Sequence, residues 1–110
     1  MKVTHDDSAY EARELRIMKE IVSSVASDLT KAGLSGAALY QATLRISFSV
    51  AEIMDGCVLL DFDDDHLAPV LAFAEGRMRD KLLAPKCGGG SMHEFTHGIV
   101  KELLGAPPKS

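Results

Sequence analysis

The sequence predicts one mainly α-helical domain of about four helices, with a short extended segment near 57–62. Three observations favour this class. Long stretches carry apolar residues at helical spacing, capping residues and glycines stand where those stretches end, and 46% of the residues are hydrophobic, enough for one core. The domain is expected to cover residues 1–105, and residues 106–110, with two consecutive prolines, are expected to form a disordered tail.

The first helix is predicted over residues 8–32, and Gly33 can end it in the left-handed conformation. Its apolar residues recur at alternating spacings of three and four, and a helix of this length extends for about 35 Å. Such a stripe must be covered by other helices of the chain, by a second copy, or by both. We expect a homodimer whose interface contains Leu15, Met18, Val22, Val25 and Leu29.

The second helix is predicted over residues 35–54, with Ser35 as its N-cap and a single narrow polar stripe. An alternative is open for this segment. Residues 44–50 also alternate with a period of two, and Asp55-Gly56 could form a tight turn into the apolar residues 57–62. That alternative is an α+β fold with a hairpin at 43–62. The alanine-rich start of the segment favours the helix.

A third helix is predicted over residues 65–84, because six apolar residues keep helical spacing there and acidic residues precede them. Gly76 weakens this prediction, and the alternative is a hairpin that turns at Glu75-Gly76.

The fourth helix is predicted over residues 91–104 and ends at Gly105. Ser91 followed by Glu94 is the pattern of a capping box, in which each side chain accepts from the backbone N–H of the other residue.

Composition excludes several classes of function. The net charge of −4 and the scattered basic residues argue against a nucleic-acid-binding protein. No apolar stretch is long enough to cross a membrane, and the polar, acidic start is unlike a targeting peptide. The two cysteines are expected to be reduced thiols, and the expected location is cytoplasmic.

The motif with the clearest chemical meaning is His93-Glu94-Phe95-Thr96-His97, which spells His-Glu-x-x-His. On a helix, the two imidazoles could share one Zn²⁺ ion while Glu94 activates a bound water. Over these five residues the chain resembles the zincin metallopeptidases. The resemblance implies a zinc hydrolase in which His93 and His97 are ligands and Glu94 is the general base. The third ligand would come from upstream, from His66 or from an aspartate of the acidic run at 63–65.

Two arguments oppose catalysis. Catalytic zinc usually takes three protein ligands, and Glu102, the one carboxylate after the motif, lies on another face of the helix. Glu94 is also explained by the capping box. We therefore expect a small non-catalytic interaction or ligand-binding module that forms a homodimer through the apolar stripe and needs no cofactor. The zinc-dependent hydrolase is the alternative.

A glycine-rich loop precedes the last helix. Free backbone N–H groups and the helix dipole can bind a phosphate or carboxylate at such a position, so Gly89, Gly90 and Ser91 are candidate anion-binding residues.

Overall fold

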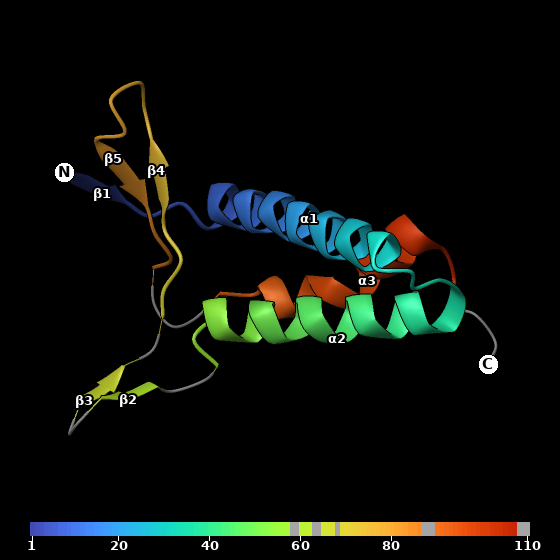
Figure 1. Cartoon of the computed structure of the whole chain (residues 1–110). Helices are drawn as coiled ribbons and strands as arrows, with labels where there is room; N and C mark the ends of the chain where they lie inside the picture. Colours follow the sequence, from blue (N-terminus) through green and yellow to red (C-terminus); the bar gives the residue numbers. More distant parts are fainter. Residues whose placement is uncertain (58–59, 63–64, 68, 87–89, 108–110) are drawn as a thin grey trace.

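A computed structural model describes residues 1–57, 60–62, 65–67, 69–86 and 90–107, with only the backbone described at 60–62 and 65–67. Most of the predicted tail, residues 108–110, therefore lies outside the described residues. The described part is mainly helical with short strands (Figure 1). Its elements in chain order are β1 (Lys2–Thr4), α1 (Asp7–Lys31), α2 (Gly36–Met54), β2 (Leu60–Phe62), β3 (Asp65–Leu67), β4 (Phe73–Glu75), β5 (Lys81–Leu83) and α3 (Met92–Leu104).

The three helices pack against one another and enclose the core (Figure 1). Asp6 is the N-cap of helix α1, and its side chain accepts from the N–H of Ala9 at 3.1 Å. The chain leaves the helix through Gly33, which has a φ of 98°. The predictions of helices over 8–32, 35–54 and 91–104 are confirmed. The buried apolar residues that form the core are Met18, Val22, Tyr40, Ala51, Met92, Ile99 and Val100.

Two small sheets lie at the end of the bundle where α1 begins and α2 ends (Figure 1). The larger has the strand order β1-β5-β4. In this sheet β1 is parallel to β5 and β4 is antiparallel to β5, so that Val3 and Ala74 flank Leu82. The smaller is the antiparallel pair of β2 and β3, in which Asp61 lies opposite His66.

The prediction of a helix over 65–84 is wrong. This segment contains β3, β4 and β5, and the hairpin of β4 and β5 contains Glu75-Gly76 as the alternative expected. Gly76 has a φ of 89° and Arg79 a φ of 53°, conformations that a right-handed helix cannot contain. The segment instead satisfies its backbone groups by pairing with β1, which comes from the start of the chain.

The hairpin expected as an alternative at 43–62 is also wrong in its position, because residues 36–54 are helical. Asp55 ends α2 in a helical conformation and Gly56 follows with a φ of 77°. The prediction of an extended segment near 57–62 is confirmed for residues 60–62, which form β2. The fold is therefore α+β in its elements, although β2 pairs with β3 and not with residues 44–50 as in that alternative. Within the described residues, no helix is both long and apolar enough to cross a membrane.

Candidate functional site

The three helices meet at the first turn of α3, where two carboxylates from the other helices are buried. The N–H of Ser91 donates to Glu14 Oε2 of α1 at 2.7 Å. The N–H groups of Met92 and His93 donate to the two oxygens of Asp55, at the end of α2, at 3.1 and 2.7 Å. Glu14 and Asp55 are each only 2% exposed. Helix α3 is thus capped by its neighbours, and the same contacts hold it against them.

The capping box predicted for this helix is wrong. The Ser91 side chain makes no capping hydrogen bond, and the N–H of Glu94 donates to the Ser91 carbonyl at 3.0 Å. The reason is that ionised carboxylates accept more strongly than a hydroxyl, and two of them already occupy this helix start. The Glu94 side chain is exposed, so the capping box does not account for it.

The backbone at Gly90 passes close to these carboxylates. A Cβ at this position would lie 2.5 Å from Glu14 Oε2 and 2.6 Å from Asp55 Oδ1, which only a glycine avoids. The N–H of Ser91 is already bonded to an internal carboxylate, that of Glu14, and the anion site at Gly90 and Ser91 stays a prediction. Gly89 lies outside the described residues.

Asp55 also binds the side chain of His93, whose Nδ1 lies 2.6 Å from Asp55 Oδ2. The His93 side chain keeps 29% of its surface exposed, while that of Asp55 is wholly buried. A buried carboxylate on one imidazole nitrogen holds the ring in place and leaves Nε2 as the other, unshared nitrogen. Cys57 Sγ lies 3.9 Å from the same Nδ1. The exposed Cys57 thiol thus lies next to the contact between His93 and Asp55.

His97 stands one turn after His93 and is exposed. Both imidazoles pack edge-on against Phe48 of α2, with ring centroids 6.1 and 5.9 Å away. The structure thus brings the two predicted zinc ligands to one aromatic ring. Among the residues whose side chains are described, no group of three or more His, Cys, Asp and Glu could hold a metal ion. The backbone of His66 lies in β3, and its side chain lies outside the described residues.

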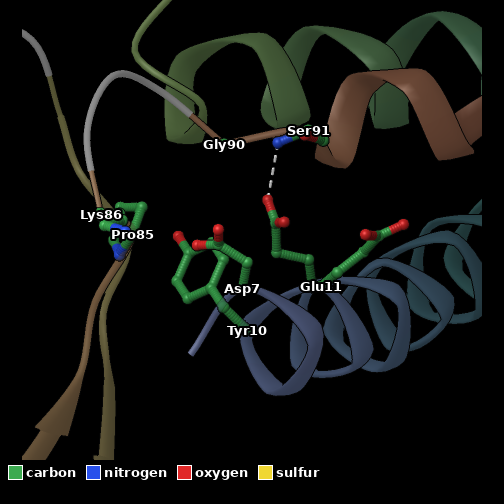
Figure 2. Close-up of a pocket in the computed structure, with 8 residues that line it drawn as sticks. Asp7, Tyr10, Glu11, Pro85, Lys86, Gly90 and Ser91 are labelled. Carbon is green, nitrogen blue, oxygen red and sulfur yellow. Dashed lines mark hydrogen bonds between the residues drawn. The ribbon is translucent and has the colours of Figure 1, made fainter. Parts of the chain in front are cut away.

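A pocket of about 240 Å³ opens between the start of α1 and the chain that leads into α3 (Figure 2). The Asp7, Tyr10 and Glu11 side chains come from α1, and Lys86 faces them across the pocket. The complete lining is Asp7, Tyr10, Glu11, Glu14, Pro85, Lys86, Gly90 and Ser91. Carboxylates therefore outnumber the single ammonium group around this space.

Burial and like charge perturb two groups of the pocket. The pKa of Glu14 is raised, first by burial and then by Asp55, Glu11 and Glu94, while the hydrogen bond from Ser91 works against the rise. Burial, with smaller effects of Glu14 and Asp55, raises the pKa of Tyr10 to about 12. The Tyr10 hydroxyl donates to the Leu71 carbonyl at 2.6 Å. The pocket is thus an electrostatically negative environment around a buried carboxylate.

The predicted dimer stripe on α1 is partly used inside the chain. Met18 and Val22 have no exposed surface and belong to the core, Val25 and Leu29 are half-buried, and Leu15 is 38% exposed. The buried face of α1 repeats every four residues, as Tyr10, Glu14, Met18 and Val22, and is rotated away from Leu15. Within one chain, two of the five predicted interface residues are thus already buried in the core, and the homodimer stays a prediction.

The sequence interpretation missed Glu14 and Asp55, the two residues that organise this site. Glu14 had a detectable signal, since it stands one helical turn before Met18 on a buried face, where a charged side chain is unusual. Asp55 had none, because an Asp-Gly pair at a helix end is accounted for by the end of the helix alone. Its partner, His93, is distant in the sequence.

Comparisons with known proteins identified no relative of this chain. No protein-family model matches the chain, and neither the curated proteins nor the solved structures contain a significantly similar one. Function has to be inferred from the residues themselves.

Proposed function

We propose that this protein is a small non-catalytic binding module, and that its ligand is a small organic cation held in the acidic pocket. The observation that carries the proposal is the pocket itself, in which Asp7, Glu11 and the buried Glu14 surround a space of about 240 Å³. This volume is below the range typical of drug-sized ligands and suits an ammonium or guanidinium head group.

Electrostatics supports a cation rather than an anion. The pKa of Glu14 is raised by burial and by neighbouring carboxylates, so its ionised form is poorly stabilised in the free protein. A bound cation would stabilise that form, and the Tyr10 ring in the wall offers an aromatic surface to it. The wall opposite is made by Pro85 and Lys86, whose one positive charge stands against the three carboxylates of the lining.

Calorimetric titration with methylguanidinium and methylammonium tests the proposal, with acetate as the anionic control. Glu11→Gln and Asp7→Asn should each weaken cation binding about fivefold, the effect of losing one exposed ion pair of about 1 kcal/mol. Both residues are exposed and lie outside the contacts that cap α3, so the fold should be unaffected. Glu20→Gln, an exposed glutamate of the same helix outside the pocket, is the matched control. Equal binding of both cations by all of these variants would refute the proposal.

A second candidate function is the zinc-dependent hydrolase, and one observation favours it. Histidines that bind zinc commonly donate their other N–H to a carboxylate, as His93 does to Asp55 in its neutral form. In this candidate His93 and His97 are ligands, Glu94 is the base, and His66 is the third ligand. Metal analysis of tag-free protein, repeated on His66→Ala and His97→Ala, tests it. One zinc per chain that either substitution removes, together with peptide hydrolysis that Glu94→Gln abolishes, would favour the hydrolase over the module.

A further inference from the structure

The outer surface of α3 carries a pair of metal-binding side chains that the proposed module does not use. His93 and His97 are four residues apart, so their imidazoles lie on one face of the helix. The same ring, Phe48, supports both of them edge-on. Two imidazoles held in this way can bind a single transition-metal ion through one nitrogen each.

Asp55 prepares His93 for that role. A neutral imidazole that donates from Nδ1 to Asp55 has its lone pair on Nε2, the state that a metal ligand requires. The contact of 2.6 Å with a fully buried carboxylate also fixes the ring, so little freedom is left to lose on binding. Cys57 Sγ lies 3.9 Å from Nδ1, the nitrogen that contacts Asp55.

The pair is incomplete as a zinc site within one chain. Structural zinc is almost always four-coordinate, and the described side chains contain no third donor grouped with these two. A second copy related by a two-fold axis would bring an identical pair, and two pairs make a four-imidazole site.

Gly98, the residue after His97, gives an independent reason to place another surface here. It stands inside α3, is exposed, and a Cβ on it would meet no atom within 4 Å. Glycine inside a helix costs about 1 kcal/mol relative to alanine, and no contact of the described residues requires it. A helix surface without a side chain at that point permits close approach by a second backbone.

We infer that two copies of this chain assemble through α3 around a shared Zn²⁺ ion, which the His93 and His97 pairs of both copies bind. The metal is essential to this assembly, because each chain carries a net charge of −4 and the exposed Glu94 lies beside each pair. The inference goes beyond the proposed function, since it uses different residues from the acidic pocket and assigns them a partner.

Sedimentation velocity and native mass spectrometry of tag-free, EDTA-treated protein test the inference, with zinc chloride as the probe. The expected result is a monomer in EDTA and, with zinc, a dimer that holds one zinc per two chains. His97→Ala should remain folded, since His97 is exposed, and should lose both zinc and dimer. His5→Ala, which removes another exposed histidine, and His66→Ala should change neither.

The Gly98→Ala variant tests whether Gly98 lies in the dimer interface or affects only the stability of the monomer. The variant should raise the thermal midpoint of the zinc-free monomer, yet weaken the zinc-dependent dimer tenfold or more. Zinc bound at one per chain without dimerisation would overturn the inference and favour the hydrolase. A dimer that persists in EDTA or in His97→Ala, or a protein that binds no zinc at micromolar concentration, would also overturn it. None of these outcomes bears on cation binding in the pocket.

Discussion

Replacing Asp55 by alanine tests whether α3 is held by carboxylates of its neighbours. The substitution removes the acceptor of three hydrogen bonds, those from the N–H groups of Met92 and His93 and that from His93 Nδ1. Hydrogen bonds to a charged group contribute about 1.5–3 kcal/mol each, and the partly exposed His93 ring can recover its bond with water. The two amide hydrogen bonds alone therefore correspond to a loss of about 3–6 kcal/mol.

A loss of this size is a large part of the roughly 5–15 kcal/mol that stabilises a typical domain. Urea denaturation followed by far-ultraviolet circular dichroism measures it. Asp6→Ala is the matched control, because Asp6 is an exposed N-cap with a single hydrogen bond, and its loss should cost about 1 kcal/mol. Asp55→Asn, which keeps one acceptor oxygen, should lie between the two. If Asp55→Ala were no less stable than Asp6→Ala, capping of α3 by its neighbours would be refuted.

Three further predictions concern the same region. Gly90→Ala should destabilise the protein by about 1–3 kcal/mol, since its Cβ would overlap two buried carboxylates, and a wild-type urea midpoint would contradict this. The raised pKa of Glu14 means that the folded state binds its proton more tightly than the unfolded state. The stability this contributes is fully present below the ordinary value of 4.5 and is lost as the pH rises through the raised value. Relative to wild type, Glu14→Gln should therefore gain stability as the pH increases above 4.5, whereas a constant difference across a pH series would exclude the effect. Tyr10→Phe should cost about 1 kcal/mol through the lost bond to Leu71, and should remove the tyrosine that titrates near pH 12 in ultraviolet difference spectra.

Local patterns in the sequence predict the helices well because a helix satisfies its own backbone groups. Apolar spacing, the N-cap positions and Gly33 are enough to place residues 8–32, 35–54 and 91–104. Residues 65–84 show the limit of this reasoning. Their apolar spacing fits a helix, but β5 is paired with β1 from the start of the chain, and no local pattern records that pairing.

The same division holds for the site. The His93 and His97 pair can be predicted from the sequence, since spacing along one helix determines which side chains share a face. The residues that surround the pair cannot be predicted in this way, because Glu14 and Asp55 reach the first turn of α3 only after three helices have packed together. Helical periodicity is a property of neighbours in the chain, whereas the capping of α3, the close approach at Gly90 and the acidic pocket arise from contacts between distant segments. Those contacts are decided by the tertiary structure alone.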